Sequence, residues 1–214
     1  MGECVIKKIV EYKIITIVRG VAKDKLIPLV QAMYDGGIRL IELTYDASGK
    51  TSDEETASNI EMLVKHFENK MTVGAGTVLT EKQVELTKAA GGKFIISPDT
   101  NPDIIKKTKA MGLVSIPGAL TPSEIAAASR AGADFVKVFP VNSMGSSYIK
   151  DVKAPLSNVK LLAVGGVTAD NMKEYFETGA CGIGVGSNIV NKNMIENNDF
   201  DGITKLAKLY TENI

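Results

Sequence analysis

The sequence predicts one α/β domain over residues 1–214, folded as a (β/α)8 barrel. Eight short apolar segments recur about every 27 residues, which leaves room for a helix and two loops after each strand. The apolar runs are continuous rather than alternating, as in parallel strands that are covered on both faces. No composition break or long linker divides the chain. An open doubly wound sheet is the alternative, but eight evenly spaced strands favour closure into a barrel.

Each predicted strand is an apolar run with helix signals beside it. In chain order, the strands are residues 14–18, 40–44, 72–75, 94–97, 114–117, 135–139, 161–164 and 182–185. Two intervening helices begin with capping boxes, Thr80 with Gln83 and Thr121 with Glu124, and Pro122 takes the first helical position of the second. Glycines end helices at positions 36–37, 91–92, 112, 132 and 179. In a barrel, the functional site lies at the carboxyl ends of the strands.

The composition excludes several classes of function. The 25 Lys and Arg residues balance 25 Asp and Glu residues, so we expect no binding to nucleic acid or to an anionic membrane. No apolar run approaches the roughly 20 residues of a membrane span, and the first residues lack a signal-peptide core, so we expect a cytoplasmic protein. The only histidine, His66, is expected at a helix surface, and Cys4 and Cys181 as reduced thiols. With one histidine and two distant cysteines, the chain lacks the ligands of a histidine-based metal centre, and a Ser-His-Asp triad is not expected.

Two charged residues stand inside apolar strands. Lys137 lies in the run 135–139 and Glu42 in the run 40–44, where both faces of a barrel strand are covered. Burial lowers the pKa of a lysine and leaves more free amine to attack a carbonyl. Burial raises the pKa of a carboxylate, and a neighbouring ammonium lowers it. The pair therefore predicts a Schiff-base lysine beside a proton-transferring carboxylate. The structural alternatives are an ion pair that neutralises both charges and a lysine that snorkels from the strand end.

Arg19 and Thr77 end the first and third predicted strands. A guanidinium binds a carboxylate through two parallel hydrogen bonds and would orient an oxo acid. A solvated strand-end arginine is an equal alternative from position alone. Thr77 offers a hydroxyl after two spaced glycines, which allow close backbone approach, or it serves only the turn.

The last two predicted strands each end in a glycine cluster. Gly165 and Gly166 follow the seventh strand, and Gly186 and Ser187 follow the eighth. In barrels, the loops at these two positions often bind phosphate through backbone N–H groups. A dinucleotide fingerprint does not fit, because no strand–helix–strand unit follows these glycines. Plain tight turns are the alternative to a phosphate site.

Taken together, these motifs resemble the family of 2-keto-3-deoxy-6-phosphogluconate (KDPG) and 4-hydroxy-2-oxoglutarate (KHG) aldolases, which are class I pyruvate aldolases. The matching pieces are residues 17–20, 36–37, 41–44, 73–78, 96–98, 116–118, 121–124, 136–140 and 165–167. Each piece is weak alone, whereas their order through nearly the whole chain makes the match specific.

The resemblance implies a role for each candidate residue. Lys137 would form the Schiff base, and Glu42 would move protons through a water. Thr77 would help to hold the pyruvyl carboxylate, and Arg19 would line the same end of the site. The other implied members of the site are Pro98 and Phe139 beside the substrate, and Gly165, Gly166, Gly186 and Ser187 at its phosphate. The implied enzyme is a homotrimer that needs no metal or cofactor. Its small-molecule substrate is a 2-oxo acid such as KDPG, which is cleaved to pyruvate and glyceraldehyde 3-phosphate. A second implied substrate is KHG, which is cleaved to pyruvate and glyoxylate.

Three departures from the family pattern concern the substrate. Asp46 stands where many members carry an arginine, and the polar stretch 46–55 looks long. Val164 stands where many members have a threonine, so one hydroxyl near the phosphate is lost. These changes leave the pyruvate chemistry intact but leave the aldehyde and the C4 stereochemistry open. The alternatives are a sugar-phosphate isomerase or epimerase, with Glu42 as base and Lys137 as electrostatic stabiliser, and a sugar-phosphate-binding barrel without catalysis.

Overall fold

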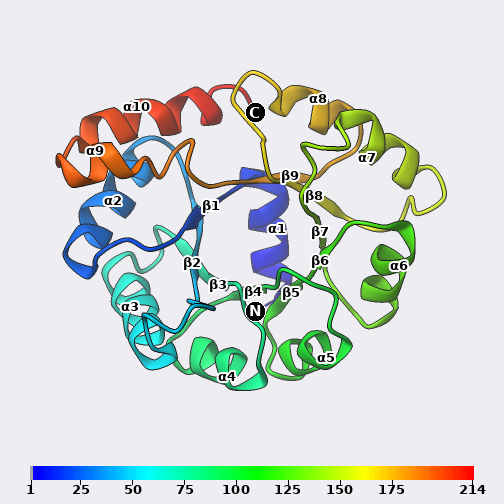
Figure 1. Ribbon diagram of the computed structural model, residues 1–214, viewed down its shortest axis with the longest axis horizontal. Coiled ribbons are helices and arrows are strands. Elements are labelled where there is room, and N and C mark those ends of the chain that lie inside the picture. The colour runs from blue at the N-terminus through cyan, green and yellow to red at the C-terminus, as the bar shows by residue number, and fades with distance from the viewer. Residues whose placement is uncertain (1) are drawn as a thin grey trace.

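The computed structural model describes residues 2–214 as one parallel sheet that is rolled into a barrel and surrounded by helices (Figure 1). The strands are β1 Ile14–Val18, β2 Leu40–Thr44, β3 Thr72–Gly76, β4 Phe94–Ile96, β5 Val114–Ile116, β6 Gly118–Ala119, β7 Val136–Val138, β8 Leu161–Val164 and β9 Gly182–Val185. The helices are α1 Gly2–Tyr12, α2 Lys23–Asp35, α3 Asp53–His66, α4 Glu81–Ala89, α5 Pro102–Ala110, α6 Pro122–Arg130, α7 Ser146–Lys153, α8 Met172–Glu177, α9 Lys192–Glu196 and α10 Phe200–Thr211. The strand order is β5-β4-β3-β2-β1-β9-β8-β7-β6.

Pro117 divides one barrel strand into β5 and β6. Proline has no N–H and therefore interrupts the hydrogen-bond ladder. β5 pairs with β4 on one side, and β6 pairs with β7 on the other, where Gly118 lies opposite Lys137. The carbonyl of Pro117 still accepts a 2.8 Å hydrogen bond from the Lys137 N–H. The two segments thus serve as one strand between β4 and β7, and the (β/α)8 barrel predicted from the sequence is confirmed.

The predicted strand limits are right for β1, β2, β8 and β9. β3 is one residue longer than predicted, and β4 and β7 are shorter. β7 ends before Phe139, because the next residue, Pro140, has no N–H to donate, and Phe139 itself is 41% exposed. Both predicted capping boxes form, at Thr80 with Gln83 and at Thr121 with Glu124.

The helix α1 was missing from the predicted elements. Its buried residues Val5 and Ile9 pack inside the barrel against Leu40, Phe94 and Val114, the first residues of β2, β4 and β5. In Figure 1, α1 lies across the centre of the barrel. Because α1 leads directly into β1, it covers the amino ends of the strands. The opposite end, with the carboxyl ends of the strands, remains for the functional site.

The histidine and the cysteines are placed as the sequence predicts. His66 is exposed in the last turn of α3. Cys4 is exposed, Cys181 is partly buried, and both are free thiols. Among the described helices, none is sufficiently long and apolar to cross a membrane.

Candidate active site

Glu42 and Lys137 meet inside the barrel, although their strands β2 and β7 are not neighbours in the sheet. The two side chains are only 4% and 9% exposed and face one small cavity. Val164, at the end of β8, lines the same cavity. The family resemblance implied a threonine near the phosphate at this position, whereas the structure places Val164 in the wall of the cavity of Lys137 and Glu42.

Burial perturbs both ionisable groups. Desolvation raises the pKa of Glu42 to about 7, against the opposing attraction of Lys137 and Arg19. Desolvation also lowers the pKa of Lys137, against the opposing attraction of Glu42. No ion pair within 4.0 Å joins the two groups among the ion pairs of residues 2–214. The buried Oε2 of Glu42 has no hydrogen-bond partner, so this oxygen remains available to a substrate or a water.

Gly76 makes room for the carboxylate of Glu42. A Cβ atom at position 76 would overlap Oε1 and the carboxyl carbon of Glu42. The next residue, Thr77, adopts a left-handed conformation with φ of 56°, and its Oγ1 accepts a 2.9 Å hydrogen bond from Nη2 of Arg19. The structure therefore joins the predicted residues Arg19 and Thr77 at the carboxyl ends of β1 and β3.

Phe139 and Pro98 lie at the same end of the barrel. The Nζ of Lys137 lies 5.1 Å from the centroid of the Phe139 ring, a cation–π distance. Pro98 is exposed directly after β4, and its carbonyl leaves no room for a Cβ at Gly118. Both residues thus lie just after the carboxyl ends of their strands, and Phe139 contacts Lys137.

The predicted phosphate residues lie at two neighbouring strand ends. Gly165 and Gly166, with φ of 97° and 77°, follow β8 in the left-handed conformation that glycine adopts readily. Gly186 and Ser187 follow β9 and line a pocket of about 450 Å³ together with Arg19 and Lys192. Lys192 was not predicted from the sequence, because a single lysine five residues after Ser187 forms no motif.

Asp46 organises the loop after β2 through hydrogen bonds to its carboxylate. Its carboxylate accepts hydrogen bonds from the N–H of Ser48 (2.9 Å), the hydroxyl of Ser48 (2.7 Å) and the N–H of Thr51 (3.0 Å). These bonds lower its pKa to about 2. The loop is also shorter than the predicted stretch 46–55, because α3 begins at Asp53 with Ser52 as its N-cap.

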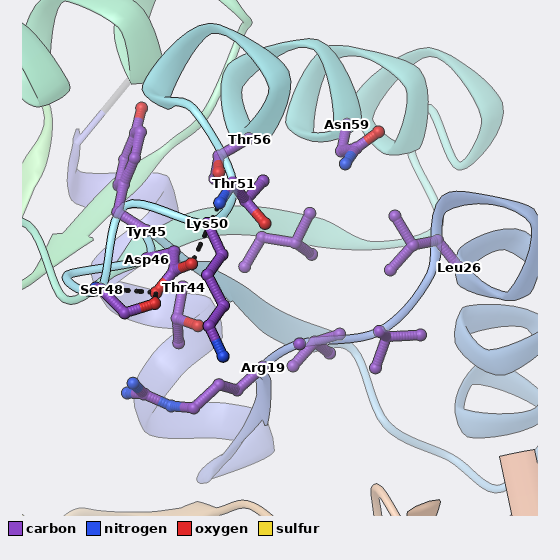
Figure 2. Close-up of a pocket in the computed structure, with 14 residues that line it drawn as sticks. Arg19, Leu26, Thr44, Tyr45, Asp46, Ser48, Lys50, Thr51, Thr56 and Asn59 are labelled. Carbon is purple, nitrogen blue, oxygen red and sulfur yellow. Dashed lines mark hydrogen bonds between the residues drawn. The ribbon is translucent and has the colours of Figure 1, made fainter.

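A pocket of about 250 Å³ opens over this loop, beyond the carboxyl ends of β1 and β2 (Figure 2). Arg19 and Lys50 both line it, and Asn59 of α3 lies in its wall. Of these residues, only Arg19 was predicted from the sequence. The polar composition of the loop pointed to Lys50, whereas Asn59 lies in α3 and had no such signal.

The fold and the site define an enzyme of the barrel class in which a buried amine meets a buried carboxylate at the carboxyl ends of the strands. Such an amine is suited to condense with a carbonyl group, and the carboxylate to move protons. Within residues 2–214, no three His, Cys, Asp or Glu side chains cluster as a possible metal site.

Comparison with known proteins assigns the family. The family described as KDPG and KHG aldolase matches residues 5–206. The 2-dehydro-3-deoxy-6-phosphogalactonate aldolase of Escherichia coli is 32% identical, over 82% of this chain and 83% of that protein. The 2-dehydro-3-deoxy-phosphogluconate aldolase of Haemophilus influenzae is 29% identical, over 95% of this chain and 93% of that protein. The chain belongs to the KDPG and KHG aldolase family.

A solved structure agrees with this assignment. The KDPG aldolase of Legionella pneumophila, with pyruvate captured as a covalent carbinolamine intermediate, superposes with a TM-score of 0.84 at 26% identity, over 97% of each chain. The chain is thus a Schiff-base (class I) aldolase, an aldehyde-lyase. This assignment sets aside the isomerase and the non-catalytic barrel.

Proposed function

We propose that the chain cleaves a 2-oxo-3-deoxy-6-phospho sugar acid to pyruvate and glyceraldehyde 3-phosphate. The candidate substrates are KDPG and its C4 epimer, the phosphogalactonate analogue, with KHG as a second, unphosphorylated substrate. The observation that carries the proposal is the meeting of Lys137 and Glu42, both buried, at one cavity inside the barrel. The names of the relatives support both epimers, because two are phosphogalactonate aldolases and others phosphogluconate aldolases.

Lys137 is the proposed nucleophile. Its neutral amine, favoured by burial, attacks C2 of the substrate, and the C2 oxygen leaves as water, so that a protonated imine remains. The C4 hydroxyl then loses its proton as the C3–C4 bond breaks. The bonding electrons move into the imine to form an enamine, and the aldehyde leaves. Protonation at C3 and addition of water at C2 release pyruvate and restore the amine.

Glu42 is the proposed proton donor and acceptor in these steps. With a pKa of about 7, it is present in both protonation states near neutral pH, as a group that gives and takes protons in one cycle requires. Its unpartnered Oε2 is free to hydrogen-bond a water or to exchange a proton with the reacting carbon C3. The isosteric neutral variant Glu42→Gln therefore separates proton transfer from shape.

The remaining site residues hold the substrate. Arg19 and Thr77, already joined by a hydrogen bond, are suited to the pyruvyl carboxylate, and Phe139 and Pro98 flank it. The phosphate is assigned to the backbone of the two glycine clusters, which are Gly165 with Gly166 and Gly186 with Ser187. Lys192, in the pocket of Ser187, adds a cation at that end.

The test of the proposed chemistry is reductive trapping. The protein is incubated with pyruvate and borohydride, and intact-mass spectrometry with peptide mapping locates any adduct. We expect one reduced pyruvyl group on Lys137 and none in Lys137→Met, whereas the exposed-lysine control Lys150→Met should be labelled as the parent is. Absence of an adduct in folded parent protein would reject the proposal.

The aldehyde half is tested by comparing substrates. Cleavage of KDPG, its C4 epimer and KHG is followed through the pyruvate released, and kcat/KM is compared. We expect at least one phosphorylated epimer to exceed KHG, because only these substrates engage the glycine clusters. On the family resemblance, we also propose that the protein is a cytoplasmic homotrimer. Light scattering of the purified protein tests the oligomeric state.

A further inference from the structure

We propose that Lys50 is a substrate-binding residue that forms, with Arg19, a two-cation subsite for an oxyanion of the substrate, either its carboxylate or its phosphate. The subsite is the pocket of about 250 Å³ at the carboxyl ends of β1 and β2. This inference rests on the proposed aldolase function and adds a residue to it. In effect, the loop after β2 supplies the cation that position 46 lacks.

The loop holds Lys50 in a defined place. Asp46 accepts three hydrogen bonds from Ser48 and Thr51, and the N–H of Gly49 donates to the Asp46 carbonyl at 3.1 Å. Lys50 lies between these anchored positions, and Figure 2 shows its side chain extending from the loop toward Arg19. A turn with this many internal bonds restricts where the amine reaches. Asp46 is therefore a positioning residue for Lys50.

The cation of Lys50 has no carboxylate partner within the described chain. The ion pairs of residues 2–214 do not include Lys50. Asp46, the one acidic residue that lines the pocket, already directs its oxygens to the loop. The pocket thus presents two cations and one carboxylate, which already accepts three hydrogen bonds from its own loop. That balance favours an anionic ligand.

The pocket wall also holds a polar group without a partner. Asn59 is 7% exposed, lines the pocket, and its Oδ1 has no hydrogen-bond partner. A buried unpaired polar atom costs free energy, so such an atom commonly marks a bound water or a ligand contact. The hydroxyls of a sugar acid, or a water bridging to them, would satisfy it.

Arg19 connects this pocket with the reacting groups. It donates to Thr77, it lines both the Lys50 pocket and the Ser187 pocket, and its charge lowers the pKa of both Glu42 and Lys137. An oxyanion held between Arg19 and Lys50 would therefore lie next to the site of the chemistry.

The experiment compares Lys50→Met with Lys50→Arg and with the control Lys23→Met. Lys23 is exposed at the start of α2, at the same end of the barrel, but does not line the pocket. We expect Lys50→Met to raise KM by about ten- to a hundredfold with little change in kcat, since a charge-assisted hydrogen bond is lost from binding. Lys50→Arg should stay near the parent value, and Lys23→Met should not differ from it.

Two ligands identify the oxyanion. Pyruvate, which carries only the carboxylate, is assayed by exchange of its methyl protons, and KDPG or its C4 epimer by cleavage. A raised KM for both identifies the carboxylate, and a raised KM for the phosphorylated substrate alone identifies the phosphate. Unchanged KM for both ligands in Lys50→Met would overturn the inference. A parent protein that forms no pyruvate adduct would instead reject the proposed function.

The positioning role of Asp46 has its own readout. Asp46→Ala should raise KM as Lys50→Met does, whereas Asp46→Asn, which keeps one acceptor oxygen, should restore part of the affinity. The double variant Asp46→Ala with Lys50→Met should have the same KM as Lys50→Met alone, because both changes remove the same interaction between Lys50 and the substrate. Full additivity of the two effects would contradict the coupling.

Discussion

Replacing Glu42 with glutamine should stabilise the folded chain more at pH 8 than at pH 5. The pKa of Glu42 is about 7 in the folded chain, compared with 4.5 for an ordinary glutamate. Between these two values the folded state retains the proton more tightly than the unfolded chain does. The free energy of unfolding therefore falls as the pH rises through this interval. The full difference between the two pKa values corresponds to about 3 kcal/mol of free energy of unfolding. This contribution falls progressively between pH 4.5 and pH 7 and is lost entirely above pH 7.

Glutamine has the same shape and no charge, so the variant lacks this pH dependence. Any fixed cost of burying its amide is the same at both pH values. At pH 5, the parent has lost only about 1 kcal/mol of this contribution, so the advantage of Glu42→Gln should grow by about 2 kcal/mol from pH 5 to pH 8. Groups that do not interact with Glu42 cancel in the comparison.

The assay is urea-induced unfolding followed by circular dichroism at pH 5 and pH 8, with linear extrapolation at one fixed protein concentration. The control is Glu11→Gln, a change at an exposed glutamate of α1, whose effect should hardly vary with pH. An equal free-energy difference between Glu42→Gln and parent at both pH values would refute the reasoning. Glu42 would then titrate as an ordinary glutamate, and its burial would not explain its chemistry.

The same variant tests catalysis independently. Glu42→Gln should slow exchange of the pyruvate methyl protons by about a hundredfold or more, the usual contribution of a general acid or base, while the protein stays folded. Unchanged exchange would reject Glu42 as the proton-transferring group, whatever its stability profile.

Three further changes probe other parts of the site and fold. Ser187→Ala should raise KM for phosphorylated substrates more than for KHG, and an equal effect on both would argue against a phosphate contact there. Gly76→Ala should abolish most activity while the circular dichroism spectrum stays native, because a Cβ at this position overlaps the carboxylate of Glu42. An active variant would show that Glu42 has room to move. Thr121→Ala should lower the free energy of unfolding by about 1 kcal/mol in urea titrations, because the Thr121 hydroxyl caps α6 by accepting a hydrogen bond from the Glu124 N–H. An unchanged free energy of unfolding would indicate that solvent replaces the cap.

Much of the fold follows from local patterns in the sequence. Continuous apolar runs such as residues 40–44 match the strands, because parallel barrel strands are buried on both faces. The capping boxes at Thr80 and Thr121 specify helix starts through bonds between residues three apart. The helix α1 has a local signal, because its buried residues Val5 and Ile9 stand four apart on one face, but the position of that face inside the barrel depends on the tertiary structure.

The candidate site divides in the same way. Lys137 and Glu42 stand out in the sequence because a charge inside an apolar run is costly to bury and therefore informative wherever the chain folds. Lys50 carries no such signal, since a lysine in a polar loop is ordinary. Its importance depends on Asp46 holding the loop and on Arg19 reaching the same pocket from another strand. Sequence patterns report what each segment requires of its surroundings, whereas only the closed barrel decides which distant side chains those surroundings contain.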